Sequence, residues 1–362
     1  MIQLKDLCQK ASSNIAQKDL EGHEGQYPIY GASGLIGYVD FYKQENPYVA
    51  VVKDGAGIGR VMCLPEKSSV IGTMQYILPN EGVNVHYLAF AMEHMNLAKY
   101  FSGATIPHIY FKDYGKEKLL ERTEKEQKSI AEILSKMDSL ISLRKQQIAK
   151  LDELVKARFV EMFGNIIRND KSWPIHNFSD IASSRLGKML DAKQQTGKYS
   201  YPYLANFNVQ WFNFNVDNLN QMDFNEAEQK EFELRDGDLL VCEGGEIGRC
   251  AVWHNEIQPC FFQKALHRVR CNRQLVQPDY LAWWFKYNCN HGGFAEIAGA
   301  KATIAHLPGI KLKQLQVALP PLSLQNEFAA FVERVDQQKQ TVQQSLDRLE
   351  LMKKALMQEY FG

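Results

Sequence analysis

A stretch in the middle of the chain is repeated at its end. Residues 121–164 align without a gap with residues 319–362, so each position in the first copy has an equivalent 198 residues later. Equivalent positions carry the same residue at Gln127 and Gln325, and again at Phe163-Gly164 and Phe361-Gly362. A gapless repeat of this length predicts that both stretches adopt the same structure.

Both copies are predicted to be long helices. From Thr123 to Phe163 and from Leu322 to Phe361 the sequence contains neither Pro nor Gly, and at 1.5 Å per residue each helix would be roughly 60 Å long. Apolar residues recur in each copy at spacings of three and four, as in a heptad pattern. The predicted stripes are Ile130, Ile133, Met137, Leu140, Ile148, Leu151 and Leu154 in the first copy, and Phe328, Phe331, Val335, Val342, Leu346, Leu349 and Met352 in the second.

The helices are expected to begin at recognisable caps. Thr123 and Glu126 form a capping-box pattern at the start of the first helix. Ser323, which follows Pro320-Pro321, is the expected N-cap of the second helix.

The segments before the two helices are also related, although more loosely. Four short motifs recur in the same order, with sequence offsets that grow from 174 through 189 and 193 to 198 residues. The pairs are Tyr27-Pro28 with Tyr201-Pro202, Asp54-Gly-Ala-Gly-Ile-Gly-Arg60 with Glu243-Gly-Gly-Glu-Ile-Gly-Arg249, Tyr87-Leu-Ala89 with Tyr280-Leu-Ala282, and Ala104-Thr-Ile-Pro-His108 with Ala302-Thr-Ile-Ala-His306. Loops of variable length between constant motifs are typical of two related globular domains.

The sequence therefore predicts a domain and a helix, repeated once. We expect α+β domains at residues 1–120 and 165–318, and helical spacers at 121–164 and 319–362. Expected strands are 48–53, 69–78, 238–242 and 266–270, and expected shorter helices are 86–100 and 278–288. If the apolar stripes pair, the two long helices run antiparallel as a coiled coil and the repeat has a pseudo-two-fold axis. Duplex DNA has a matching symmetry.

These motifs resemble the specificity subunit of a type I restriction-modification system. The resemblance rests on Leu319-Pro-Pro-Leu-Ser-Leu-Gln325, the ending Leu356-Met-Gln-Glu-Tyr-Phe-Gly362, the string Tyr27-Pro-Ile-Tyr-Gly-Ala-Ser-Gly-Leu-Ile-Gly37 and the two Gly-x-Ile-Gly-Arg strings. It covers almost the whole chain. One departure is that the first helix follows Leu119-Leu120 instead of Leu-Pro-Pro.

The resemblance implies a non-catalytic subunit with two target recognition domains. Such a subunit would recognise a bipartite site in double-stranded DNA and dock two methyltransferase subunits and, through them, restriction subunits. It implies that this chain binds no cofactor itself. S-adenosylmethionine would be bound by the methyltransferase subunits, and ATP and Mg²⁺ by the restriction subunit.

Composition is compatible with this function but does not by itself indicate DNA binding. The chain has 42 Lys and Arg against 42 Asp and Glu, and its pI is near 7.1. A domain that bound phosphates alone would be more basic, so we expect a partner to contribute affinity. No signal peptide or long apolar run is present, which favours a cytoplasmic protein without membrane contact.

Other site types are less well supported. The seven cysteines lack zinc-ligand spacing, so we expect no metal site, and Gly55-Ala-Gly-Ile-Gly59 lacks the spacing of a nucleotide-binding loop. Ile29-Tyr-Gly31 and Leu35-Ile-Gly37 faintly resemble the halves of a GIY-YIG nuclease core but lie too close together. Two alternatives remain: a stand-alone site-specific nuclease or methyltransferase on the same scaffold, and a coiled-coil assembly protein with no role on DNA.

Candidate DNA-binding residues fall into two groups. Residues repeated in both domains are expected to contact the backbone, while residues in variable loops are expected to read bases. The expected phosphate contacts are Arg60, Arg249, Thr105 and Thr303, with added charge from Lys53, Lys112, Lys301 and Lys311. The expected base-reading residues are Gln75, Asn206, Asn208, Gln210, Gln263 and Lys264.

The sequence leaves two interpretations open for each of two further features. The aromatic stretch Tyr199 to Phe214 is either a recognition loop or a half-buried pair of strands with polar outer positions. The equivalent His108 and His306 either make structural hydrogen bonds or face DNA.

Overall fold

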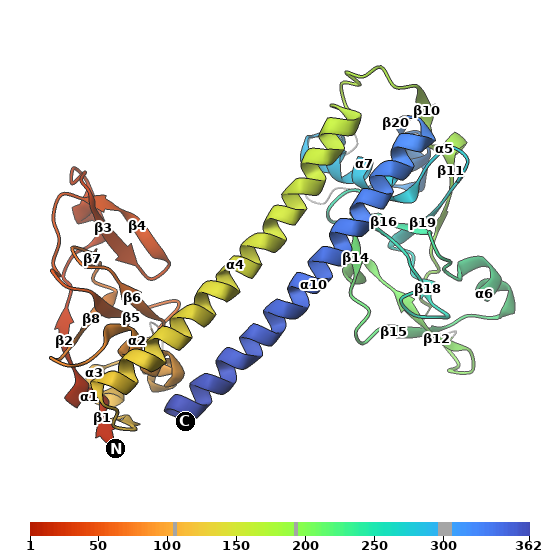
Figure 1. Cartoon of the computed structure of the whole chain (residues 1–362). Helices are drawn as coiled ribbons and strands as arrows, with labels where there is room; N and C mark the ends of the chain where they lie inside the picture. Colours follow the sequence, from red (N-terminus) through yellow and green to blue (C-terminus); the bar gives the residue numbers. More distant parts are fainter. Residues whose placement is uncertain (104–106, 192–194, 296–305) are drawn as a thin grey trace. The chain divides into compact units, whose positions relative to one another are not determined.

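The chain forms two compact units that each combine sheets and helices. The computed structural model describes residues 1–103, 107–191, 195–295 and 306–362. Residues 1–148 and 341–362 make up unit 1, and residues 149–340 make up unit 2. Figure 1 shows the elements of both units. The predicted mixture of helices and sheets is confirmed.

Unit 1 is built on a four-stranded antiparallel sheet in the order β2-β8-β5-β6. A three-stranded sheet, β4-β3-β7, and the pair β1-β9 complete it. The elements are β1 (Ile2–Gln3), α1 (Leu4–Leu7), β2 (Cys8–Ser12), η1 (Gln17–Leu20), β3 (Tyr27–Gly31), β4 (Gly34–Val39), β5 (Tyr48–Val52), β6 (Val61–Leu64), β7 (Ser69–Val70), β8 (Met74–Pro79), α2 (Val85–His94), η2 (Leu97–Tyr100), α3 (Phe111–Tyr114) and β9 (Lys118–Leu119).

Unit 2 repeats this topology. Its four-stranded sheet has the order β11-β19-β16-β17, its three-stranded sheet the order β15-β12-β18, and β10 pairs with β20. A short hairpin, β13-β14, has no counterpart among the described strands of unit 1. The elements are β10 (Ile175–Asn177), α5 (Phe178–Ile181), β11 (Ala182–Leu186), β12 (Ser200–Leu204), η4 (Asn206–Asn208), β13 (Val209–Gln210), β14 (Asn213–Phe214), β15 (Asn220–Asp223), α6 (Glu226–Phe232), β16 (Leu239–Cys242), β17 (Cys250–Val252), β18 (Phe261–Phe262), β19 (Leu266–Cys271), α7 (Pro278–Asn290), α9 (Gly309–Lys313) and β20 (Gln316–Ala318).

Two predicted elements are each broken in the structure. The expected helix 86–100 ends at His94, because Asn96 adopts a left-handed backbone conformation (φ 49°) before the separate turn η2. The expected strand 69–78 is two strands in different sheets, since β7 pairs with β3 while β8 pairs with β2 and β5. A continuous apolar run in the sequence does not reveal such a change of sheet.

The two long helices are present as predicted. Helix α4 spans Glu124–Phe163 and helix α10 spans Leu322–Phe361, and both contribute to unit 1 and to unit 2. The capping box of α4 is confirmed: the Thr123 nitrogen donates to Glu126 at 2.8 Å and the Glu126 nitrogen donates to Thr123 Oγ1 at 3.3 Å. The predicted cap at Ser323 is wrong, because α10 has already begun at Leu322.

The helices run antiparallel within each unit. In unit 1, Asp138 pairs with Lys353 at 2.8 Å and Lys145 pairs with Glu350 at 2.7 Å. The residue number on α10 therefore decreases as the residue number on α4 increases, as in an antiparallel pair. In unit 2, Asp152 pairs with Lys339 at 2.6 Å and Arg158 with Glu327 at 2.8 Å, in the same sense.

The buried seam of the helices differs in part from the predicted stripe. Ile130, Leu134 and Met137 are buried in α4, and the equivalent positions in α10 are Phe328, Val332 and Val335. Four residues assigned to the stripe are exposed instead, namely Ile133, Leu140, Leu154 and Met352. The seam keeps a strict alternation of three and four residues, and it includes polar positions such as Lys339 and Lys353 that an apolar search passes over.

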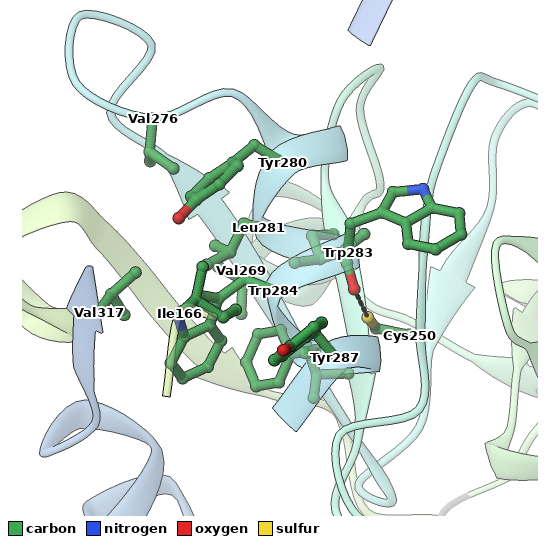
Figure 2. Packing of buried hydrophobic residues seen from close by; sticks show 14 of the residues in the cluster. Ile166, Cys250, Val269, Val276, Tyr280, Leu281, Trp283, Trp284, Tyr287 and Val317 are labelled. Carbon is green, nitrogen blue, oxygen red and sulfur yellow. Dashed lines mark hydrogen bonds between the residues drawn. The ribbon is translucent and has the colours of Figure 1, made fainter. Parts of the chain in front are cut away.

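A short helix packs on the four-stranded sheet in each unit. In unit 2, helix α7 lays Leu281 against Val269 of β19, and the carbonyl of Ala282 accepts a long contact from the Cys250 thiol of β17 (Figure 2). The Tyr280 hydroxyl donates to the Ala318 carbonyl at 2.5 Å. The central strands β5 and β16 are buried along their whole length, consistent with their runs of aliphatic residues.

The repeated glutamine fixes the start of each long helix to its domain. In unit 1, Gln127 Oε1 accepts the backbone N–H of Asn84, the N-cap of α2, at 3.0 Å. In unit 2, Gln325 Oε1 accepts the backbone N–H of Gln277, the N-cap of α7, at 2.9 Å. Both glutamines are buried, so these bonds are made away from water.

Candidate nucleic-acid interface

Two of the repeated motifs and the turn after β3 meet in unit 1. Arg60 Nη1 donates to the Ala32 carbonyl at 2.7 Å, which joins the Gly-x-Ile-Gly-Arg loop to the turn after β3. The Gly55 nitrogen donates to the Pro107 carbonyl at 3.1 Å, and the His108 ring bonds to the Asp54 carboxylate. Motifs up to about 80 residues apart in sequence therefore form one cluster.

The same motifs meet in unit 2. Arg249 Nη2 donates to the Asn206 carbonyl at 3.1 Å and to Asn206 Oδ1 at 2.7 Å. Asn206 Nδ2 in turn donates to the Gly244 carbonyl at 2.9 Å, and Gly244 forms an isolated β-bridge with His306. We call these two sets of contacts the motif clusters of unit 1 and unit 2.

The glycine before each arginine is required by the backbone. Gly59 and Gly248 are equivalent, and they have φ values of 82° and 75°. A Cβ at Gly59 would lie 2.5 Å from the Ala98 nitrogen, and one at Gly248 would lie 3.0 Å from the rings of Phe285 and Phe294. These glycines let the loop that carries each arginine pack closely on its domain.

The two histidines make structural contacts in both units. His108 is partly buried and bonded to Asp54, and His306 lies against the backbone of Gly244. Of the two interpretations of these residues, the structure favours structural hydrogen bonding for His108.

Two of the predicted base-reading residues belong to the protein interior. Gln75 is buried in β8 and its Oε1 accepts the Tyr114 hydroxyl at 2.8 Å. Asn208 is also buried; its Oδ1 accepts the Ala205 nitrogen and its Nδ2 donates to the Asn215 carbonyl, both at 2.9 Å. These two predictions are corrected, because the side chains stabilise the local backbone and do not reach the surface.

Asn206 and Gln210 lie on the turn and hairpin that follow β12. The side-chain amide of Asn206 accepts a hydrogen bond from Arg249 and donates one to the Gly244 carbonyl, so it too belongs to the motif cluster of unit 2. Gln210 is exposed, although its Nε2 donates to the Phe207 carbonyl at 3.0 Å. Gln263 is half-buried and Lys264 is exposed in the turn between β18 and β19.

The two arginines predicted to contact phosphate are bonded to the protein, and their contact with phosphate stays a prediction. Each directs a guanidinium N–H at a backbone carbonyl in the turn that follows β3 or β12. The Arg249 Nε is buried and has no hydrogen-bond partner in the described part of the chain, which shows how far this side chain is drawn inward. Both arginines therefore join the Gly-x-Ile-Gly-Arg loop to a neighbouring turn of their unit.

The predicted basic residues are spread over several elements. Lys53 is half-buried beside Asp54 at 3.7 Å, and Lys112 is exposed with its ammonium 5.1 Å from the centroid of the Tyr110 ring. Lys311 is exposed in the last turn of α9. Thr105, Lys301 and Thr303 lie outside the described residues.

Other basic residues of unit 2 are bound within the fold. Arg268 is buried, its Nη1 donates to the Glu231 carbonyl at 2.6 Å, and loss of hydration lowers the pKa of its guanidinium to about 10. Arg270 forms two hydrogen bonds with Asp238, at 2.7 and 3.1 Å. Strand β19 thus uses its arginines to tie loops to the sheet.

Sequence reasoning missed how the aromatic stretch is divided between surface and interior. Phe207 is 60% exposed beside Asn206, whereas Phe214 is 6% exposed and packs on Trp253 with ring centroids 5.2 Å apart. Trp211 Nε1 donates to Glu246 at 2.7 Å. Unit 1 exposes Leu35 and Tyr38 on its β3-β4 hairpin. The alternation of aromatic and amide residues pointed to this segment as a candidate site. It could not show which of its side chains are exposed.

Neither a metal site nor a membrane-spanning helix is found in the described residues. In residues 1–103, 107–191, 195–295 and 306–362, no group of three or more His, Cys, Asp or Glu side chains is arranged to hold a metal ion. Within these same ranges, no helix has the length and apolar character needed to span a bilayer. All seven cysteines have free thiols.

Comparison with known proteins identifies the family. The family described as type I restriction modification DNA specificity domain matches residues 1–153 and 170–351. The two matches correspond to most of the chain, and the chain belongs to this family. It is a family of specificity domains, which are non-catalytic.

Individual relatives are distant in sequence. A Haemophilus influenzae protein named as a type I restriction enzyme specificity subunit is 22% identical over 333 residues, which are 86% of this chain and 80% of that protein. A Methanocaldococcus jannaschii protein named as the type I restriction enzyme MjaX specificity subunit is 23% identical over 195 residues, 53% of this chain. The chain spans 46%, about half, of the length of that second relative.

Solved structures share the fold. The S subunit of a type I restriction-modification system from M. genitalium superimposes with a TM-score of 0.66 at 16% identity, covering 100% of this chain and 95% of that one. A chain from a structure of type I R-M complex assembly and conformational transition gives a TM-score of 0.53 at 12% identity, covering 99% and 96%. At this level of identity the similarity applies to the fold alone.

Proposed function

We propose that this chain is the DNA specificity subunit of a type I restriction-modification complex and reads a bipartite site in double-stranded DNA. One observation carries the proposal: each unit builds the same motif cluster and places a different exposed hairpin beside it. A common scaffold with different surface residues suits two domains that read different half-sites. Membership of the DNA specificity family supports the same function.

The long helices connect the two reading domains in this proposal. We propose that α4 and α10 form an antiparallel coiled coil, with a pseudo-two-fold axis relating the two halves of the chain. The equivalent seam positions in the two copies and the antiparallel ion pairs within each unit support this arrangement.

The exposed apolar residues of the helices fit a docking role. Leu154 and Met352 are equivalent in the repeat, and their exposed fractions are 48% in unit 2 and 54% in unit 1. Apolar side chains left in water at equivalent places favour two similar partners, one for each unit. We propose that two methyltransferase subunits dock here, and that restriction subunits join through them.

The chemistry would belong to these partners. S-adenosylmethionine is proposed to bind the methyltransferase subunits, and ATP and Mg²⁺ the restriction subunits, while this chain supplies sequence recognition. Because its substrate would be cellular and invading DNA, we propose a cytoplasmic location. The alternative of a stand-alone nuclease or methyltransferase is not favoured, since the family consists of specificity domains.

The proposal is tested by reconstituting methylation. The purified chain alone should leave DNA unmethylated, whereas the chain with its methyltransferase should methylate one bipartite motif, detected by sequencing of modified bases. Replacing residues 205–213 with a foreign loop should change one half of the motif and leave the other half unaltered. Methylation without sequence preference, or by the chain alone, would contradict the proposed function.

A further inference from the structure

The two repeated arginines hold equivalent places on two different loops. Ala32 and Asn206 are related by the same 174-residue offset that relates Tyr27 to Tyr201, and they follow the equivalent strands β3 and β12. Arg60 donates to the carbonyl of Ala32 at 2.7 Å, and Arg249 donates to the carbonyl of Asn206 at 3.1 Å. The same bond is therefore made twice, in units with different surrounding residues.

Each arginine holds a turn that continues directly into an exposed hairpin. In unit 1, Ala32 lies in the turn between β3 and β4, and Leu35 and Tyr38 of β4 are exposed. In unit 2, Asn206 is followed by the exposed Phe207 and by Gln210 on the β13-β14 hairpin. A charge-assisted hydrogen bond at the base of a short hairpin restricts the positions available to its tip.

We propose that Arg60 and Arg249 are positioning residues for base reading, each acting through the hairpin of its own unit. This inference rests on the proposed function. The arginines do not contact DNA themselves; they fix the turn so that the exposed hairpin side chains meet one set of base edges. Loss of either arginine should therefore relax recognition of one half-site only.

The two units differ in how firmly the turn is held. Asn206 adds a side-chain acceptor for Arg249 at 2.7 Å and a second bond from its Nδ2 to the Gly244 carbonyl at 2.9 Å. Ala32 offers Arg60 only its backbone carbonyl. The residue at position 32 or 206 is therefore a second determinant of how firmly the turn is held. We expect unit 2, which has Asn206, to discriminate more strictly against wrong bases in its half-site.

Lysine is not an adequate substitute for arginine here. In unit 2 a single guanidinium nitrogen reaches both the carbonyl and the side chain of Asn206, while Nε stays buried. An ammonium group keeps the charge, but it is more strongly hydrated and sits on a more flexible stem, so desolvating and ordering it at this half-buried place costs more. Arg249→Lys should therefore conserve charge and still lose positioning.

The experiment uses the full chain assembled with its methyltransferase, and compares Arg249→Ala, Arg249→Lys and Arg60→Ala with the wild type. The readouts are the sequence of methylated sites, DNA affinity over a range of salt concentrations, and hydrogen exchange of residues 206–214. Arg249→Ala and Arg249→Lys should both lower discrimination at one half-site about tenfold, the size expected for one hydrogen bond to a charged group. Arg60→Ala should relax the other half-site instead.

Hydrogen exchange and salt dependence separate positioning from phosphate binding. Positioning predicts faster exchange of residues 206–214 in Arg249→Ala and an unchanged slope of log affinity against log salt. A phosphate contact predicts a uniform loss of affinity on all sequences, a slope smaller by about one, and rescue by Arg249→Lys. That second result would overturn the inference and leave the proposed function intact. A wild-type complex without any sequence preference would instead contradict the proposed function.

A milder pair of substitutions covers the case in which Arg249→Ala does not fold. Asn206→Ala gives unit 2 the chemistry of unit 1, and Ala32→Asn does the reverse. The first should relax one half-site and the second should sharpen the other, while the thermal midpoints remain close to the wild type. Unchanged discrimination in both variants would overturn the role of this position.

Discussion

The ring of Phe361 packs on the ring of Tyr87, with 5.3 Å between their centroids. The equivalent Phe163 packs on the equivalent Tyr280 at 4.9 Å. The phenylalanine comes from the end of α10 in unit 1 and from the end of α4 in unit 2. Together with the glutamine bonds at the helix starts, this means that each unit contains the start of one long helix and the end of the other.

The glutamine bond predicts a measurable contribution to stability. Gln325→Leu removes the acceptor of the Gln277 N–H and two donated bonds to backbone carbonyls, at 2.7 and 3.1 Å. Because the site is fully buried, we expect a loss of about 1–3 kcal/mol in the free energy of unfolding. Chemical denaturation measures it. Gln338→Leu, on the exposed face of the same helix, should change stability by less than about 0.5 kcal/mol.

The helix seam predicts that the effect of a charged substitution on stability depends strongly on its position within α10. Leu346 is 5% exposed and Leu351 is 69% exposed, although they lie only five residues apart. Leu346→Asp places a charge in the seam and should lower the free energy of unfolding by at least about 3 kcal/mol. Leu351→Asp should have little effect on the denaturation midpoint. Equal effects of the two substitutions would show that the helices do not pair along this seam.

Each of the two proposed docking sites is predicted to be lost through a substitution in its own unit. Leu154→Asp and Met352→Asp each put a charge on one of the two equivalent exposed sites, without disturbing the core. Native mass spectrometry at saturating methyltransferase should find two bound copies on the wild type, one on either single variant and none on the double variant. Gln338→Asp is the matched control and should still bind two. If both single variants kept two copies, docking would have to be assigned to another surface.

Acid should loosen one loop of unit 2. Asp223 Oδ2 accepts hydrogen bonds from the Thr196 hydroxyl at 2.7 Å, the Thr196 nitrogen at 2.5 Å and the Gly197 nitrogen at 2.9 Å. These bonds, the Thr196 hydroxyl first, hold the pKa of the Asp223 carboxyl below its usual 3.8. The stabilisation is therefore present above pH 3.8 and is lost as the pH falls through the lowered pKa.

Hydrogen exchange of residues 196–199 follows this acid transition directly. The wild-type protein should lose protection there below pH 3.8, after correction for intrinsic exchange rates. Asp223→Asn should show weak protection at every pH and no acid step. An acid step that persists in Asp223→Asn would assign the transition to another carboxyl group.

The repeat made the helices and the mixed domains predictable, but not the exact seam. A stripe chosen by hydrophobicity included Ile133 and Leu140 and passed over Lys339 and Lys353. Long cationic side chains can lay their stems in a seam and reach an acid on the facing helix, as Lys353 does with Asp138. Hydrophobic periodicity measures only the apolar share of such an interface.

The candidate site was predictable as a set of segments, but not in the roles of single residues. The repeated arginines could serve either the fold or phosphate binding, and their acceptors are backbone carbonyls 28 and 43 residues away. The sequence does not reveal which carbonyl accepts such a bond, since every residue has one. Gln75 and Asn208 were misassigned for a related reason, because amides that support the backbone look the same in sequence as amides that read bases.

The division of the chain into units also sets the order in which they can be completed during synthesis. Unit 2 uses residues 149–340 only, whereas the core of unit 1 includes Met357 and Phe361, which are synthesised after unit 2. The domain that leaves the ribosome first therefore waits longest for its full core, and the domain made second can close before it. Until Phe361 has been synthesised and has left the ribosome, the apolar surface around Tyr87 that it covers stays open, which makes the nascent first domain the part most in need of protection from aggregation.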